Sequence, residues 1–145
     1  MKSIDVASSS VKDKTRKLLQ ECGLPFDDVN MSHLQHFLVI RKDDEDIIGV
    51  VGLEALGQVA LLRSLAVHES HRKQGLASQL IIKIESYAQW AGIRELYLLT
   101  LTAGNFFSKR GYQSIDRSNV PEPVKATREF QSLCPETAVC MVKYL

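Results

Sequence analysis

The 145-residue sequence lacks the long segments that would place it in a membrane or a secretory pathway. No apolar run approaches the roughly 20 residues that a membrane-spanning helix needs, and the first ten residues lack the apolar core of a signal peptide. Internal repeats, low-complexity tracts and linkers rich in proline or serine are also missing. The sequence therefore predicts a single domain, residues 1–145, located in the cytoplasm.

The sequence contains few cysteines and has a small net charge. The three cysteines, Cys22, Cys134 and Cys140, cannot all pair within one chain, so we expect free thiols in a reducing compartment. Eighteen basic and 17 acidic residues leave a formal net charge of +1, which argues against a general electrostatic grip on nucleic acid. We therefore expect neither a nucleic-acid nor a membrane partner.

Two common nucleotide-binding patterns are absent as well, because the chain contains no G-x-x-x-x-G-K-[ST] and no G-x-G-x-x-G. The apolar run Leu61–Val67, broken by Arg63 and Ser64, instead predicts a buried strand, and Gly75 opens an amphipathic run. The first N–H groups of such a helix lack internal partners and lie at the positive end of its dipole. A phosphate or pyrophosphate is the expected ligand, although similar junctions in many α/β domains bind nothing.

Apolar periodicity and turn residues predict the remaining elements. Strands are expected at 3–7, 36–41, 47–54, 61–67, 95–101, from 111, and 139–145, with helices at 10–23, 76–91 and 103–109. Strands two to four should form an antiparallel meander, and the helix after strand four should make strand five parallel to it. The charged run 42–46 is expected to be a solvated turn, and no metal is expected.

The sequence Arg72-Lys73-Gln74-Gly75-Leu76-Ala77, which follows a strand ending in Leu-Ala-Val-His, matches the pattern R-x-x-G-x-G/A. It resembles the acyl-coenzyme A signature of the GNAT acetyltransferases, and the element order matches that family over essentially the whole chain. The resemblance implies an α/β (α+β) fold in which helices flank a mixed central sheet of about six to seven strands, as a meander followed by βαβαβ. It also implies acetyl-coenzyme A as co-substrate.

The resemblance further implies which residues hold acetyl-coenzyme A. Backbone amides from Gln74 to Ser78 would hold the pyrophosphate, and the edge of Leu65-Ala66-Val67 would pair with the pantetheine amides. By position, the Val67 N–H is the expected donor to the thioester oxygen. The complete expected set is Leu65, Ala66, Val67, Arg72, Lys73, Gln74, Gly75, Leu76, Ala77, Ser78, Asn105 and Phe107.

The segment from Asn105 to Tyr112 resembles the family's F-Y-x-k-x-G-F, with one departure. The tyrosine that protonates the leaving thiolate in many members falls on Phe107, which has no proton to give. Water, a displaced hydroxyl such as that of Ser108 or Tyr112, or no acid at all would serve here, because a thiolate is a tolerable leaving group.

The expected general base is Glu54, which ends strand three beside the central strand, with His68 as the second choice. A strand-end carboxylate that faces water is the alternative for Glu54. Arg63 lies inside an apolar strand, where an unpaired charge is costly. It should therefore meet a carboxylate, either a structural one such as Glu54 or that of a substrate.

Within the family, the string LLRSLAV resembles the acetyltransferase domain of N-acetylglutamate synthase, which favours the substrate carboxylate for Arg63. The tail, including Cys134, resembles the ArsN-type acetyltransferases of arsenic-resistance operons. These likenesses imply N-acetylation of a small amino acid or amino-acid-like amine, including an arsenic-containing one, by direct transfer in a ternary complex. They also allow a homodimer. The alternatives are a non-catalytic acetyl-coenzyme A sensor and a protein or peptide N-acetyltransferase.

Overall fold

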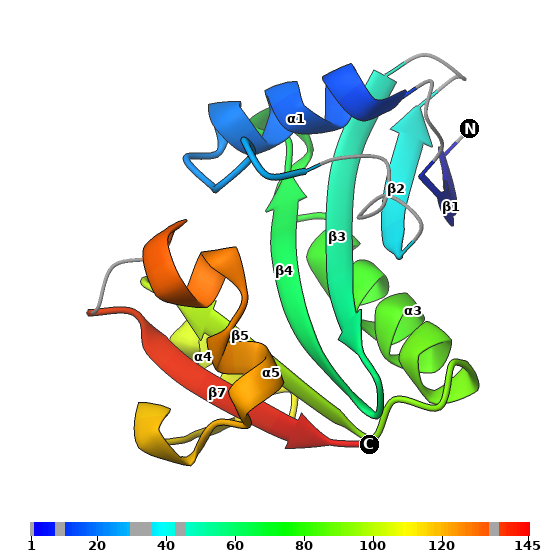
Figure 1. The fold of residues 1–145 in the computed structure, drawn as a ribbon. Coiled ribbons are helices and arrows are strands. Elements are labelled where there is room, and N and C mark those ends of the chain that lie inside the picture. The colour runs from blue at the N-terminus through cyan, green and yellow to red at the C-terminus, as the bar shows by residue number, and fades with distance from the viewer. Residues whose placement is uncertain (1, 8–10, 30–35, 43–45, 134–136) are drawn as a thin grey trace. The chain divides into compact units, whose positions relative to one another are not determined.

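The computed structural model describes residues 2–7, 11–29, 36–42, 46–133 and 137–145 (Figure 1). Its strands are β1 (Lys2–Val6), β2 (Phe37–Lys42), β3 (Asp46–Leu56), β4 (Val59–Val67), β5 (Glu95–Thr100), β6 (Gln113–Ser114) and β7 (Val139–Tyr144). Its helices are α1 (Lys12–Glu21), α3 (Leu76–Trp90), α4 (Gly104–Ser108) and α5 (Glu122–Lys125), with 3₁₀ turns at Glu69–His71 and Arg117–Asn119 and a π-helical segment at Glu129–Leu133.

The strands form one seven-stranded sheet in the order β1-β2-β3-β4-β5-β7-β6. Strand β4 pairs with β5 in parallel, whereas β1–β2, β2–β3, β5–β7 and β6–β7 are antiparallel. The predicted mixed sheet, its meander and its parallel β4–β5 pair are confirmed. The C-terminal strand β7 lies between β5 and β6, so β6 is at the edge.

The chain divides into two compact units, residues 1–54 with 63–87, and residues 55–62 with 88–145. In the first unit, helices α1 and α3 cover opposite faces of β2, β3 and the second half of β4 (Figure 1). Leu18 and Leu19 of α1 join a buried cluster with Phe37, Val39 and Val50. On the other face, a Cβ built on Gly49 would lie 3.3 Å from the Leu80 side chain of α3. The expectation of a single domain stays a prediction.

Helix α1 begins and ends close to the predicted positions. Val11 precedes its first residue and makes no side-chain cap, while Ser10, where the helix was predicted to begin, lies outside the described residues. At the other end Gly23 has φ +72, which favours glycine, and the Leu24 N–H donates to the Leu19 carbonyl at 3.0 Å. This bond terminates the helix at the predicted glycine.

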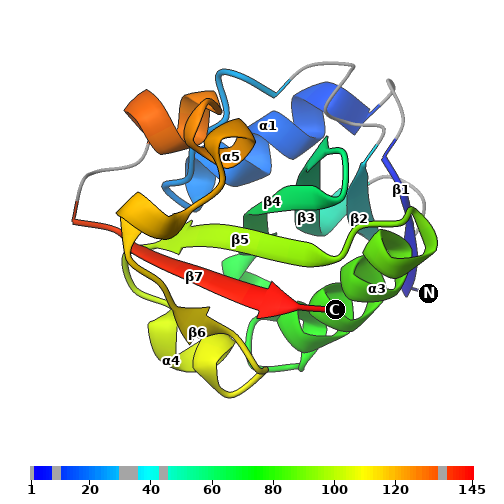
Figure 2. The same cartoon turned by 60° about the horizontal axis from the view of Figure 1, so that its bottom comes forward.

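In the second unit, α4 and α5 lie on opposite sides of the β5–β7 pair (Figure 2). Tyr97 of β5 and Cys140 of β7 pack with Val120 and Val124 in one buried cluster. The segment from 117 to 133 forms short helical turns that the sequence pattern did not predict. Among the described helices none has the length and apolar character to cross a membrane.

Candidate active site

The turn between β4 and α3 has the geometry of a strand–glycine–helix junction. Residues 72–75 are exposed, and Gly75 has φ +77, a conformation that side chains other than glycine's rarely adopt. The Gln79 N–H donates to the Gly75 carbonyl at 3.1 Å, so helical bonding starts at Gly75. In an α-helix the N–H groups that precede this first bond have no helical acceptor. The predicted helix start is confirmed at Leu76.

The residues of this turn leave room for an anion. A Cβ added to Gly75 would meet no atom within 4 Å, so the backbone borders open space at this point. Leu76 is buried and fixes the helix to the core, while Ala77 and Ser78 are partly exposed and small. An anion can therefore approach the positive end of a 15-residue helix without displacing a side chain of the core.

Two non-glycine residues among those described have positive φ, Ser64 at +62° and Lys73 at +63°. Ser64 is buried inside β4, where it breaks the regular alternation of side chains next to Arg63. Lys73 lies within the exposed turn. Such strained residues concentrate at functional sites, and here one lies in each of the two segments from which the site was predicted.

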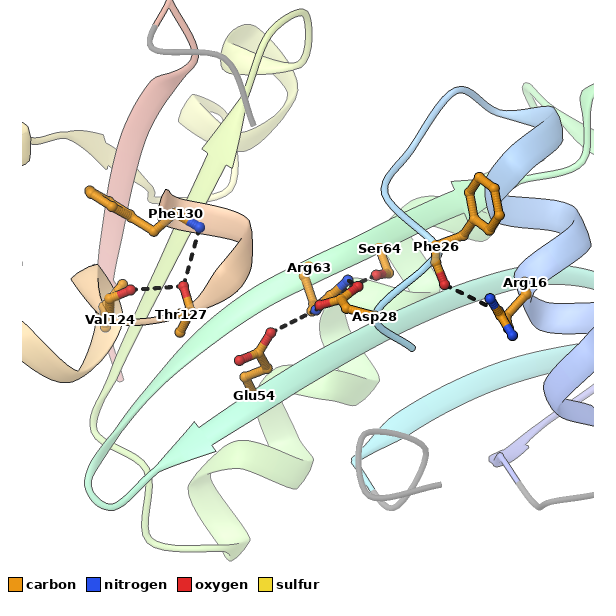
Figure 3. A network of polar contacts seen from close by, with 9 residues as sticks. All are labelled: Arg16, Phe26, Asp28, Glu54, Arg63, Ser64, Val124, Thr127 and Phe130. Carbon is orange, nitrogen blue, oxygen red and sulfur yellow. Dashed lines mark hydrogen bonds and ion pairs between the residues drawn. The ribbon is translucent and has the colours of Figure 1, made fainter. Parts of the chain in front are cut away.

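Arg63 is the centre of a buried charged cluster that also contains Asp28 and Glu54 (Figure 3). Its Nη1 donates to Asp28 Oδ2 at 2.5 Å and to Glu54 Oε1 at 2.6 Å, and its Nη2 donates to Asp28 Oδ1 at 2.6 Å. Its Nε donates to Ser64 Oγ at 3.0 Å. The side chains of Arg63, Asp28 and Glu54 are 0, 3 and 14% exposed. One guanidinium thus joins the loop after α1 to both central strands.

Arg63 was predicted to meet either a structural carboxylate such as Glu54 or the carboxylate of a substrate. The structure contains structural carboxylates at Asp28 and Glu54. At least four of the five N–H groups of the guanidinium already donate to protein atoms. A bidentate bond to a substrate carboxylate would require Asp28 or Glu54 to move away. The substrate-binding role of Arg63 stays a prediction, and this geometry does not favour it.

Asp28 was not predicted from the sequence, because Asp27 and Asp28 are equivalent by residue type. In the structure Asp27 is exposed, whereas Asp28 is 5% exposed and paired with Arg63. The only available signal was the need of a buried arginine for a carboxylate.

The second candidate base, His68, lies at the start of the turn after β4. Its Nδ1 accepts a hydrogen bond from the Ser70 N–H at 3.2 Å and thereby caps the 3₁₀ turn. Its Nε2 lies 3.9 Å from Glu21 Oε2. This arrangement gives His68 a structural task, while Glu54 belongs to the buried cluster.

A cavity of about 300 Å³ lies between the end of α1 and this turn, lined by Leu18, Glu21, Cys22, His68, Glu69 and Arg72. Arg72 Nε donates to the Val67 carbonyl at 3.0 Å, and its Nη2 lies 3.6 Å from Cys22 Sγ. The Arg72 side chain therefore ties the predicted cofactor turn to the end of β4 and to α1.

Asn105 and Phe107 lie on α4, in the second unit. Phe107 is 6% exposed and packs edge-on against Phe106 and Tyr112, with ring centroids 5.1 and 5.4 Å away. Asn105 is exposed. The contacts of both residues with acetyl-coenzyme A stay predictions. Among the described residues, no group of three or more histidine, cysteine or acidic side chains could hold a metal ion.

The cysteines are expected to differ in reactivity. Cys22 is partly exposed in the cavity beside Arg72, whereas Cys140 is 3% exposed and burial raises the pKa of its thiol. Because the thiolate is the reactive form, iodoacetamide at neutral pH should alkylate Cys22 in the native protein and Cys140 only after unfolding. Peptide mass spectrometry measures both sites, and labelling of native Cys140 at the rate of Cys22 would contradict the structure. Cys134 lies outside the described residues.

The amino-acid sequence matches a known family model and several curated proteins. Residues 33–114 match the acetyltransferase (GNAT) domain. An uncharacterized N-acetyltransferase of Chlorobaculum tepidum is 36% identical over 123 residues, which are 79% of this chain and 74% of the relative. The amino-acid acetyltransferase of Edwardsiella ictaluri is 28% identical over 102 residues, or 68% of this chain. The match spans only 22% of that enzyme's length.

A solved structure shares the fold. N-acetylglutamate synthase from Neisseria gonorrhoeae, complexed with coenzyme A and N-acetyl-glutamate, matches with a TM-score of 0.84 and 22% sequence identity. The match covers 100% of this chain and 35% of the synthase chain. At this identity the likeness establishes the fold, including the strand–turn–helix unit from which the site was predicted.

Proposed function

The chain belongs to the GNAT family of acetyltransferases and is therefore an acyltransferase enzyme, and from this premise we propose that it acetylates the amine of a small amino acid or amino-acid-like molecule. Acetyl-coenzyme A is the proposed donor, and the transfer is direct, within a ternary complex. The observation that carries the proposal is the open, glycine-bent turn at the N-terminus of α3. Homologues named amino-acid acetyltransferases support the acceptor class.

In this proposal the chain holds acetyl-coenzyme A by backbone groups. The N–H groups from Gln74 to Ser78 would bind the pyrophosphate, with Arg72 and Lys73 nearby, and Leu65 to Val67 would pair with the pantetheine amides. Asn105 and Phe107 complete the proposed set. Acetyl-coenzyme A, when bound, would supply the activated acetyl group as a thioester. The Val67 N–H would donate a hydrogen bond to the thioester oxygen.

The acceptor must present a neutral amine at the acetyl carbon. Its nitrogen forms the new C–N bond as the C–S bond breaks, one proton passes from nitrogen to a base, and coenzyme A leaves as the thiolate or, after protonation, as the thiol. Glu54 is the proposed base because it belongs to the buried cluster while its side chain remains 14% exposed. His68 is the alternative.

No protein acid is proposed for the leaving thiolate, because Phe107 occupies the tyrosine position. Tyr112 is 2% exposed, so Tyr112→Phe should change kcat by less than about threefold, whereas loss of a general acid costs about 100-fold or more. Steady-state kinetics measures this, with Ser108→Ala as the companion variant for the exposed hydroxyl. A 100-fold fall in kcat for Tyr112→Phe would instead identify Tyr112 as the acid.

The test of the proposal is acetyl-coenzyme A consumption by the purified protein with a panel of free amino acids, among them glutamate, arginine, and analogues that carry phosphinic or arsenic groups. Release of free thiol together with an N-acetylated product, identified by mass spectrometry, supports the proposed reaction. Binding of coenzyme A without turnover of any amine would contradict it and would favour a sensor or a protein acceptor.

A further inference from the structure

Glu54 is anchored through one of its two carboxylate oxygens. Oε1 accepts from Arg63 Nη1 at 2.6 Å, and the described residues supply Glu54 with no second partner. The side chain is 14% exposed, so Glu54 is within reach of a molecule that enters from outside. Because Oε1 is bonded to Arg63, Oε2 is the carboxylate oxygen with no hydrogen-bond partner among the described residues.

Asp28 fixes the guanidinium that anchors Glu54. Its two carboxylate oxygens accept hydrogen bonds from Arg63 Nη1 and Nη2, at 2.5 and 2.6 Å, in a bidentate pair. Ser64 Oγ accepts a hydrogen bond from Arg63 Nε. This fork restricts rotation of the guanidinium more than a single bond would. The position of Glu54 Oε1 thus depends on a residue 26 positions earlier in the chain, on the loop after α1.

Among the described side chains that form this cluster, the acidic groups outnumber the basic one. Arg63 contributes one positive charge, and Asp28 and Glu54 contribute two negative charges, so these three groups sum to −1. An ammonium group complements this charge, whereas a carboxylate would be repelled by both acidic side chains. The cluster therefore fits the amine end of an amino acid better than its carboxylate end.

We infer that Asp28 and Arg63 are positioning residues that hold Glu54 Oε2 toward the acceptor amine, so that this cluster recognises an ammonium group rather than a carboxylate. The inference rests on the proposed acetyl transfer to an amine. Glu54 takes one proton from the ammonium nitrogen before the C–N bond forms and releases it to water, which leaves the neutral amine, and it then takes the second proton as that bond forms. The proposed acceptors are therefore primary amines that need no free carboxylate.

Matched acceptors test this preference. Each active amino acid is compared with its own carboxamide, which keeps the amine and removes the negative charge. The kcat/KM for the carboxamide should be no more than about threefold lower than that for the acid. An acid preferred more than about tenfold over its amide, with that preference lost in Arg63→Lys, would overturn the inference and assign Arg63 to the substrate carboxylate.

Matched variants test the positioning role. Asp28→Asn keeps the shape but loses the anionic anchor, and kcat should fall by about tenfold or more, as expected when a general base is misplaced. The kcat of Glu54→Gln should fall at least as far. Asp27→Asn, on the neighbouring exposed residue, should leave kcat within about twofold of the native value.

The affinity for coenzyme A, measured by calorimetry, separates positioning from unfolding. It should stay within about twofold in Asp28→Asn, because the α3 turn is not altered. A kcat unchanged in Asp28→Asn, or coenzyme A affinity lost in parallel with kcat, would overturn the positioning role. If no amine is acetylated while coenzyme A still binds, the proposed function itself fails, and the inference falls with it.

Discussion

Arg63→Met is expected to lower the free energy of unfolding by about 3 to 5 kcal/mol, the cost of breaking a buried ion pair from one side. Methionine keeps most of the length of the side chain, so the loss reports charge and hydrogen bonding more than a cavity. Asp28 and Glu54 would remain, 3 and 14% exposed, without their guanidinium. Urea unfolding followed by circular dichroism measures the difference.

Two controls define this result. Arg94→Met, at an exposed arginine, should change the free energy of unfolding by less than about 0.5 kcal/mol. The triple variant Asp28→Asn, Glu54→Gln, Arg63→Met should recover part of the loss, because no isolated charge stays buried. A loss below about 1 kcal/mol in Arg63→Met would contradict the buried cluster, since it would mean that both carboxylates reach water.

The affinity for coenzyme A should fall by about 100-fold in Gly75→Val, which corresponds to about 2.7 kcal/mol. The backbone at φ +77 is strained for a β-branched residue, so the turn should rearrange and misdirect the N–H groups of the first turn of α3. The new side chain would also enter the open space that the phosphates are proposed to fill. Isothermal titration calorimetry measures the change.

Gly92→Val is the matched control, because Gly92 follows the other end of α3, has φ +85 and also has no atom within 4 Å of an added Cβ. It should destabilise the fold about as much as Gly75→Val while coenzyme A affinity stays within about twofold. Equal losses of affinity in the two variants, or an unchanged affinity in folded Gly75→Val, would contradict the proposed role of the turn.

The parts of the fold that could be predicted are those in which local chemistry and periodicity agree. Gly75 and Gly92 flank an amphipathic run, and both adopt the positive φ that made glycine necessary. The parallel pairing of β4 and β5 could be predicted from the helix between them, because parallel strands need a long crossover connection, which is usually a helix. The insertion of β7 between β5 and β6 depends on pairings distant in sequence and has no local signal.

The candidate site, like the fold, could be predicted only where its residues are close together in the sequence. The proposed cofactor turn is contiguous in sequence, so a motif of six residues was enough to predict the glycine turn and the start of the helix that the structure shows. The charged cluster joins Asp28 to Arg63 across 35 positions, and nothing local distinguishes Asp28 from Asp27. Burial of Arg63 was predictable from its apolar neighbours, and the identity of its main partner was not. Likewise, the positive φ of Ser64 could not be predicted, because its residue type does not require it.

The central claim is that the N-terminus of α3 binds the pyrophosphate of coenzyme A. Calorimetric titration of the native protein with coenzyme A and, separately, with pantetheine tests this most directly, since pantetheine keeps the thiol and both amides but lacks the pyrophosphate and the adenosine 3′-phosphate attached to it. Coenzyme A should bind at least about 100-fold more tightly, because several charge-assisted N–H bonds are lost with the phosphates. Equal affinities for the two compounds, or no binding of coenzyme A, would contradict the claim.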